Sequence, residues 1–95
     1  MNIEHKQSGN KGMFFIRGND KNIAEMTYSL SEPDIMIIDH TWVDDSLRGK
    51  NVGYQLVDKG AVFAREHHYM IIPLCPFANA VFKKKKEEYK DVLKP

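Results

Sequence analysis

The sequence is short of almost everything that marks a secreted, membrane-spanning or nucleic-acid-binding protein. It has one cysteine, Cys75, so an internal disulfide is excluded. No apolar run approaches the length of a membrane span, and the opening MNIEHKQSGN lacks the apolar core of a signal peptide. The formal net charge of +1 gives no overall attraction to nucleic acid or to an anionic membrane. These absences predict a cytoplasmic protein with neither a nucleic-acid nor a membrane partner.

The chain also lacks internal repeats and any linker rich in proline, glycine or serine. Its 95 residues are therefore expected to form a single domain over 1–95. A chain of this length buries roughly two-thirds of the surface that it exposes when unfolded, which is enough for one modest core. The content of 42% hydrophobic and 11% aromatic residues is typical of a folded globular protein.

The first half of the chain has the patterns of β-strands separated by turns. Residues 13–17 (MFFIR) are apolar and aromatic, and residues 23–30 (IAEMTYSL) alternate between two faces after a turn-forming GNDKN stretch. Beyond the turn residues SEPD, residues 35–43 (IMIIDHTWV) are rich in side chains that favour strands. Residues 2–7 are a further candidate strand. The sequence therefore predicts an antiparallel meander.

The pattern then changes to a helical period. Apolar residues from Val52 onward predict a helix over 51–67, with capping groups just upstream of it. Residues 69–75 (YMIIPLC) predict a short buried strand, and residues 77–90 predict a second helix. A right-handed crossover through the first helix would make the strands at 35–43 and 70–74 parallel. The predicted fold is mixed α/β (α+β): a meander, a helix, a parallel strand and a C-terminal helix.

The loop before the first helix has the character of an anion site. Free N–H groups in the first helical turn and the helix dipole favour negative charge, and Gly49 and Gly53 let a ligand approach the backbone. Arg48 and Lys50 add cations. Asn51 stands where a third glycine would complete the pattern, although asparagine tolerates a left-handed conformation. The alternative is an ordinary helix start with solvated cations, and the spacing fits neither the Walker nor the dinucleotide-binding motif.

The stretch VDDSLRGKNVGYQLV resembles the acetyl-CoA-binding segment of the GNAT superfamily of N-acetyltransferases. That segment reads Arg/Gln-x-x-Gly-x-Gly/Ala, and Arg48, Asn51 and Gly53 occupy its three defining positions, with Asn51 in place of the first glycine. Together with IIPLCPFANAVFKKKKEEY, it is similar to a very short GNAT-like subfamily with a cysteine at the end of the strand after the helix. The resemblance covers about residues 12–91.

This resemblance implies a minimal GNAT-like fold and an acyltransferase that moves an acetyl group from acetyl-CoA to an unidentified amine. It implies that backbone N–H groups over residues 49–54, those of Val52 and Tyr54 among them, bind the pyrophosphate of CoA. The strand end at Trp42 and Val43 would bond to the pantetheine arm. Full-length relatives have a helical segment between the first two strands and extra terminal strands, for which this chain has no room. The acceptor site is thus expected to be more open than usual, or completed by a partner.

Two residues are candidates for the chemistry. Full-length relatives often protonate the leaving thiolate with a tyrosine, but Phe82 stands at that place and Cys75 replaces an upstream asparagine of the same motif. His40, near the end of its strand, carries an imidazole, the side chain most often used as a general base. A Cys75–His40 arrangement permits an acetyl-cysteine intermediate, or direct transfer with His40 deprotonating the amine. The structural alternatives are a small buried hydrophobe for Cys75 and a hydrogen-bonded sheet residue for His40.

The remaining features carry weaker expectations. The four lysines at 83–86 are expected to be solvated, although one of them would be able to meet the 3′-phosphate of CoA. His67 and His68 have no third ligand nearby in the sequence, so no metal site is expected. Trp42 is expected to pack in the core. The alternative function is a CoA-binding or protein-interaction module with little or no turnover.

Overall fold

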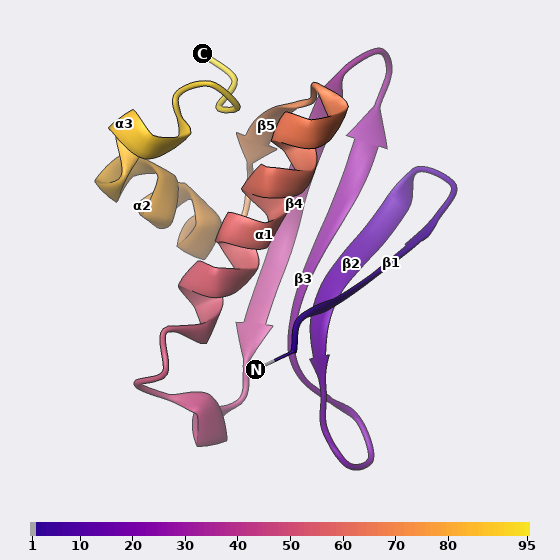
Figure 1. Ribbon diagram of the computed structural model, residues 1–95, viewed down its shortest axis with the longest axis vertical. Coiled ribbons are helices and arrows are strands. Elements are labelled where there is room, and N and C mark those ends of the chain that lie inside the picture. Colours follow the sequence, from indigo (N-terminus) through magenta and orange to yellow (C-terminus); the bar gives the residue numbers. More distant parts are fainter. Residues whose placement is uncertain (1) are drawn as a thin grey trace.

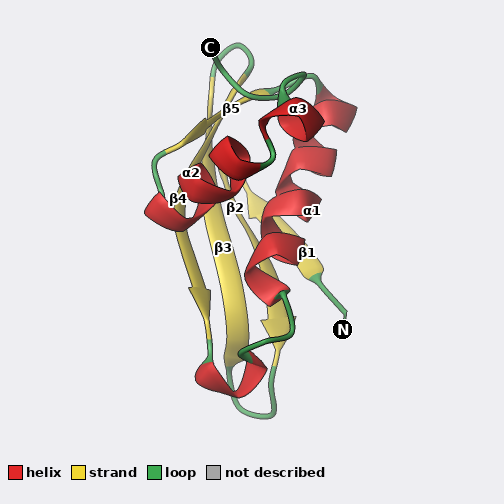
Figure 2. Ribbon diagram, turned by 90° about the vertical axis from the view of Figure 1, so that its left-hand side faces the viewer, coloured by secondary structure: helices red, strands yellow, loops and turns green. Residues whose placement is uncertain are grey.

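The computed structural model describes residues 2–95 and consists of one five-stranded sheet with helices on one side of it (Figure 1). The strands lie in the order β1-β2-β3-β4-β5, antiparallel except for the last, parallel pair. The strands are β1 (Glu4–Ser8), β2 (Lys11–Arg17), β3 (Asn22–Ser31), β4 (Ile35–Val43) and β5 (Met70–Pro73). The helices are α1 (Val52–His67), α2 (Pro76–Lys84) and α3 (Lys86–Tyr89), and a 3₁₀ turn, η1 (Asp45–Leu47), precedes α1. Figure 2 looks onto the helices, with the sheet behind them.

The sequence predictions for the sheet and the main helix are confirmed. The candidate N-terminal strand forms as β1, β4 has the predicted bounds, and β4 and β5 run parallel. The predicted second helix over 77–90 is wrong in one respect, because the chain breaks at Lys85 (φ −115°, ψ 41°) into α2 and α3. The break turns Tyr89 into the core, where it is 1% exposed and its hydroxyl donates to Asp58 Oδ1 at 2.7 Å.

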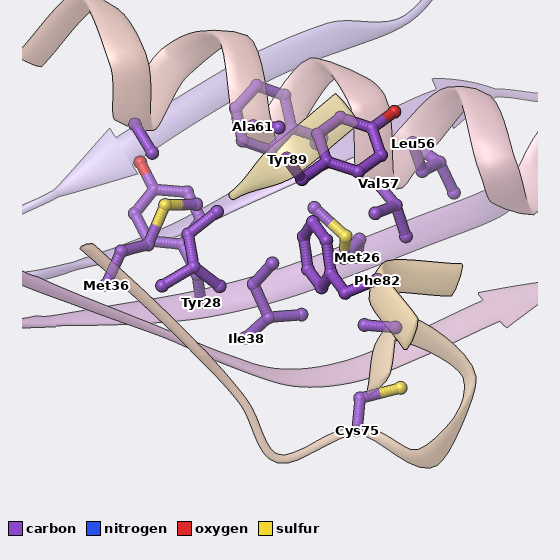
Figure 3. Packing of buried hydrophobic residues seen from close by; sticks show 14 of the residues in the cluster. Met26, Tyr28, Met36, Ile38, Leu56, Val57, Ala61, Cys75, Phe82 and Tyr89 are labelled. Atoms are coloured by element: carbon purple, nitrogen blue, oxygen red, sulfur yellow. The ribbon is translucent and has the colours of Figure 1, made fainter. Parts of the chain in front are cut away.

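The core lies between the helices and one face of the sheet. Alternate residues of β3, namely Ala24, Met26 and Tyr28, are almost completely buried beneath α1. The helix approaches the sheet closely at Gly60, where an added Cβ would lie 2.7 Å from Met26 Cε. The close view in Figure 3 shows Met26 and Tyr28 facing the side of α1 that carries Leu56, Val57 and Ala61. No helix among residues 2–95 covers the opposite face, which we call the open face of the sheet (Figure 1).

A β-bulge in β4 changes which side chains reach the open face. Tyr28 pairs with Ile38 but the preceding Thr27 pairs with His40, so Asp39 is the extra residue. A bulge of this kind redirects the side chains that follow it. Ile38 points to the core before the bulge, whereas Asp39 and His40 are both exposed beside Thr27 on the open face.

No helix among residues 2–95 combines the length and apolar character needed to cross a bilayer. The two longer helices, α1 and α2, instead pack against the sheet. In α1 the buried positions recur at helical spacing, with Val52, Leu56 and Val57 in the first half and Gly60, Ala61 and Ala64 in the second. This spacing of buried positions shows that α1 packs one side on the sheet and exposes the other to solvent.

The imidazole of His5 is expected to make the attachment of β1 sensitive to pH. Its ring stacks on Phe14 (centroids 4.2 Å apart), and Nε2 lies 2.7 Å from the Tyr28 hydroxyl. Partial burial, and to a lesser extent the nearby His67, lower the pKa of His5 below its usual value. A histidine with a lowered folded-state pKa stabilises the fold at pH values above its unfolded pKa, and that stability is lost as the pH falls. We therefore expect the Tm to drop by a few degrees between pH 7.5 and about pH 5.

The measurement is thermal unfolding of the wild type and His5→Gln across this pH range, followed by circular dichroism. The other histidines are present in both proteins, so the difference between the two curves isolates His5. The drop is expected to be smaller in His5→Gln. Parallel curves for the two proteins would show that His5 does not contribute.

Candidate functional site

The parallel strands β4 and β5 separate at the bulge and leave an open strand edge. Their pairing ends at Ile38 and Pro73, after which the N–H groups of Leu74 and Cys75 both donate to Ile38 O, at 3.0 and 3.1 Å. The chain then turns into α2, while β4 continues to Val43 with no strand of the described residues beside it on the β5 side. Ligands of open α/β sheets bind at such carboxyl ends of parallel strands. The edge of β4 beyond the bulge is thus available to a ligand.

The loop between η1 and α1 has the backbone conformation of an anion site. Asn51 adopts the left-handed conformation (φ 61°, ψ 28°), as its residue type permits, and Gly49 also has a positive φ of 82°. No side chain caps α1, so the N–H groups of its first turn point out of the helix without an intrahelical acceptor. The 16-residue helix directs the positive end of its dipole to the same point. Arg48 is exposed and pairs with Asp45 at 2.9 Å.

A surface pocket of about 250 Å³, here called the loop pocket, lies against this segment. It is lined by Val43, Leu47, Arg48, Gly49, Asn51, Val52, Gly53, Tyr54 and Phe77. Most of the residues predicted to bind the cofactor therefore surround one hollow, whereas Trp42 and Lys50 are not on its lining. Leu47 and Phe77 are additions that the sequence argument missed.

Phe77 joins the loop pocket to a second hollow. An added Cβ at Gly53 would lie 2.5 Å from Cζ of the Phe77 ring, and that ring is 43% exposed. A neighbouring pocket of about 460 Å³, here called the groove, lies between α1 and α2. It shares Asn51, Tyr54 and Phe77 with the loop pocket and adds Ala80, Val81, Lys84 and Lys85. Aromatic surface and two lysines next to an anion loop suit a ligand with a flat ring and a further anionic group.

Cys75 lies where the open strand edge meets the start of α2. Its side chain is 5% exposed, and Figure 3 shows it at the margin of the core, in the turn before the helix. Burial by itself would raise the pKa of the thiol, but the Thr41 hydroxyl and the backbone N–H groups of Ala78 and Phe77 outweigh it and lower the pKa. The Thr41 Oγ1 atom is buried and, among residues 2–95, makes no hydrogen bond of good geometry. The groups around the sulfur therefore lower the pKa of the thiol although it is buried.

His40 does not take the place beside Cys75 that the sequence suggested. The β4 side chain next to the thiol is Thr41, because the bulge at Asp39 turns His40 to the open face. His40 is opposite Thr27 on the open face, whereas Cys75 belongs to the core cluster beside Thr41, so the two side chains lie on opposite sides of the open edge. The two side chains, which the sequence allowed to face one cleft, therefore do not lie side by side. Their catalytic roles remain predictions.

Two aromatic residues of the predicted site are also placed by the structure. Phe82, which stands where full-length relatives have tyrosine, is completely buried and makes an edge contact with Tyr89 at 5.2 Å between centroids. The expectation that Trp42 packs in the core is wrong, because it pairs with Glu25 on the open face and is 36% exposed. The lysines at 83–86 are exposed, as expected.

The described residues give no sign of a metal centre. Within 2–95, no three His, Cys, Asp or Glu side chains are arranged so that they could hold an ion. His67 instead directs Nδ1 to the carbonyl of Phe63 at 2.9 Å, within its own helix.

Comparison with known proteins identifies the family. The family model described as GCN5-related N-acetyl-transferase matches residues 13–92. An NMR structure of a GCN5-like protein from Staphylococcus aureus has 37% sequence identity and a TM-score of 0.74, covering 98% of this chain and 89% of that one. No match is found among curated proteins.

Two more distant structures have the same fold. A ribosomal-protein-alanine N-acetyltransferase from Brucella melitensis is 20% identical, with a TM-score of 0.61 over 94% of this chain and 64% of that one. A protein from Bacillus anthracis, crystallised with acetyl-coenzyme A, is 18% identical, with a TM-score of 0.61 over 82% of this chain and 47% of that one.

Proposed function

This chain belongs to the GCN5-related N-acetyltransferase family and is an acetyl-CoA-dependent acyltransferase; from that premise we propose how its residues hold the cosubstrate and transfer the acetyl group to an amine. The observation that carries the proposal is that the uncapped start of α1 and the open edge of β4 meet at one point. Phe77 and Cys75 lie where the two converge. The start of α1 suits the phosphates of CoA, and the open edge of β4 beside Cys75 suits the reacting thioester.

The pyrophosphate of CoA binds at the loop pocket. The first-turn N–H groups of α1 supply the donors, and the glycine at position 53 leaves the backbone accessible. Arg48 and Lys50 contribute charge from the rim. The adenosine 3′-phosphate lies in the groove, where Tyr54 and Phe77 offer apolar surface and Lys84 and Lys85 offer cations.

The pantetheine arm runs along the open edge of β4, from Val43 towards Thr41. Backbone groups of an unpaired strand edge are suitable partners for its two amides, because they have no other strand to bond. Trp42 contributes through its backbone, since its side chain lies on the open face. This path places the thioester beside Cys75.

The acetyl group then has two routes to the amine, and we favour the one through Cys75. The thiolate attacks the thioester carbonyl, a new carbon–sulfur bond forms on Cys75, and CoA leaves as its thiolate and takes up a proton. The amine next attacks acetyl-Cys75, the nitrogen–carbon bond forms, and the Cys75 thiolate is released while a base accepts the amine proton. His40, exposed on the open face beside the same edge, is the proposed base. The lowered thiol pKa supports this route.

The test is a CoA titration followed by NMR, and then incubation with acetyl-CoA. We expect amide shifts in residues 49–54 and at the β4 edge, and one acetyl group on Cys75 in the mass spectrum. Free CoA is expected to appear when amino-acid, peptide or polyamine acceptors are added, and His40→Ala is expected to slow that release about 100-fold. CoA binding without release for any acceptor would instead identify a binding module with little turnover, and no binding would refute the cofactor assignment.

A further inference from the structure

We propose that the acceptor is a small amine carrying a second positive charge, such as a short aliphatic diamine, and that it binds on the open face of β3 and β4. The proposal rests on the function above and names the substrate class of the same site. Its residues are Glu25 and Thr27 of β3 with Asp39, His40 and Trp42 of β4, which together we call the acceptor face.

The open face is the side from which an acceptor is able to reach the thioester. On the helix side, Cys75, Thr41 and the start of α2 lie against the open edge of β4. On the other side no helix covers the sheet (Figure 1), and the Leu74 side chain at the end of β5 is 65% exposed. CoA enters from the helix side, because α1 and the loop pocket are there. A second substrate therefore approaches from the open face.

The acceptor face carries two carboxylates without a cation. Glu25 is half-buried and Asp39 is exposed, and neither forms an ion pair with any group among residues 2–95. Arg17, on the neighbouring strand β2, is held by Glu4 at 3.2 Å. Lys6 and Arg17 both lie over the Phe15 ring, at 5.4 and 5.6 Å, and Phe15 is opposite Glu25 in the β2–β3 register, but neither cation forms an ion pair with Glu25. A partly buried carboxylate with no partner is costly, and a cationic ligand would offset that cost.

An exposed indole beside one of these carboxylates favours an ammonium group. Trp42 lies directly opposite Glu25 in the strand register, so their Cβ atoms are about 5 Å apart. An aromatic face and a carboxylate attract the same ligand charge, since an ammonium binds to either. Thr27 donates a hydrogen bond to Asp39 and so fixes the second carboxylate next to His40. Both acids therefore have defined positions on the surface.

The spacing favours a short ligand with two amines. His40 and Trp42 are two residues apart on one face of a strand, which corresponds to roughly 7 Å. One amine, deprotonated by His40, would face the thioester, while the other stays protonated between Glu25 and Trp42. An amine with no second charge loses that contact, and an amine that carries a carboxylate meets repulsion instead.

The chain provides its own reporter for the test, because Trp42 is its single tryptophan. CoA-saturated protein is titrated with 1,4-diaminobutane, butylamine and 4-aminobutyrate while Trp42 fluorescence is recorded. We expect the diamine to bind at least about tenfold more tightly than butylamine, and 4-aminobutyrate to bind most weakly. Glu25→Gln is expected to remove the preference for the diamine, whereas Glu66→Gln, an exposed change on α1, leaves it intact. The acetylated product, with acetyl-CoA present, should follow the same order in kcat/KM.

Equal affinity for the diamine and butylamine, or an undiminished preference in Glu25→Gln, would overturn the proposal. Asp39→Asn serves as a second variant and is expected to weaken diamine binding by a smaller factor. CoA affinity, measured first on each variant, separates the two proposals. Intact CoA binding with no diamine preference refutes the acceptor class alone, whereas lost CoA binding in the wild type refutes both.

Discussion

Replacing Gly53 with valine is expected to raise the Kd for CoA by at least about 100-fold, equivalent to roughly 3 kcal/mol of binding free energy. Gly53 lies in the first turn of α1, where the N–H groups that would bind pyrophosphate are unsatisfied by any cap. A Cβ at this position already falls 2.5 Å from the Phe77 ring, and the two methyl groups of valine would extend into the loop pocket. The fold is expected to survive, because Phe77 is 43% exposed and free to turn. Isothermal titration with CoA, beside a thermal unfolding curve, measures both quantities.

Gly53→Val has two effects that have to be separated. The new side chain crowds the Phe77 ring, and it also obstructs the first-turn N–H groups of α1. Gly53→Ala displaces the ring but adds little bulk over the N–H groups, so a loss of only a few-fold is expected. Phe77→Ala in the Gly53→Val background removes the crowded ring, and CoA affinity is expected to stay low because the valine remains. Recovery of CoA affinity in that double variant would mean that Gly53→Val weakens binding by displacing the Phe77 ring. A Kd for Gly53→Val within threefold of the wild type would contradict the pyrophosphate assignment.

Local sequence patterns were sufficient to predict the strands and the residue conformation that position the loop before α1. The bounds of β4 follow from a run of strand-forming residues between turn signals, and the parallel pairing with β5 follows from the handedness of crossovers. The left-handed Asn51 could also be anticipated, because asparagine is one of the few residues that adopts this conformation at low cost. Each of these depends on residues close together in the chain.

The bulge at Asp39 could not be predicted in the same way, and it decided the chemistry of the site. Strict alternation from Met36 and Ile38 would place His40 and Trp42 on the core side. The extra residue reverses that assignment, so both are exposed on the open face and Thr41 takes the position beside Cys75. The bulge depends on how β4 aligns with β3, and the letters IMIIDHTWV do not encode that register.

The break between α2 and α3 has a similar long-range cause. The residues around Lys85 are good helix formers, so the local sequence predicts one continuous helix. The break allows Tyr89 to bury its ring while its hydroxyl reaches Asp58 and Tyr54 of α1. That tertiary contact outweighs helix propensity, which amounts to less than about 1 kcal/mol per residue.

Replacing Cys75 with alanine is expected to lower kcat for acetyl transfer at least about 100-fold while CoA affinity changes little. The thiol lies at the N-terminus of α2, and the N–H groups of Phe77 and Ala78 together with the Thr41 hydroxyl lower its pKa despite burial. Lowering the pKa raises the fraction of thiolate, which is the form that attacks a thioester. The variant should also carry no acetyl group after incubation with acetyl-CoA, as read by mass spectrometry.

Serine at the same position separates chemistry from structure. Cys75 is the N-cap residue of α2 and makes no side-chain capping bond, whereas serine is among the preferred N-cap residues. Cys75→Ser is therefore expected to be at least as stable as the wild type, yet as inactive as Cys75→Ala, because a serine hydroxyl has no comparable tendency to ionise. Activity of the serine variant within threefold of the wild type would make Cys75 a structural residue and leave direct transfer as the route.

Thr41→Val tests the cause of the lowered thiol pKa. The substitution keeps the branched shape of the side chain and removes the buried Oγ1 atom, which has no well-formed hydrogen bond of its own in the described chain. Since the hydroxyl contributes to the lowered pKa of Cys75, its removal raises that pKa, and the thiolate then forms only at higher pH. The alkylation rate of Cys75 as a function of pH should shift upward in Thr41→Val, with acetyl transfer at neutral pH falling in step. An unchanged alkylation profile would mean that the helix N–H groups alone hold the thiolate, and Thr41 would then have no part in the reaction.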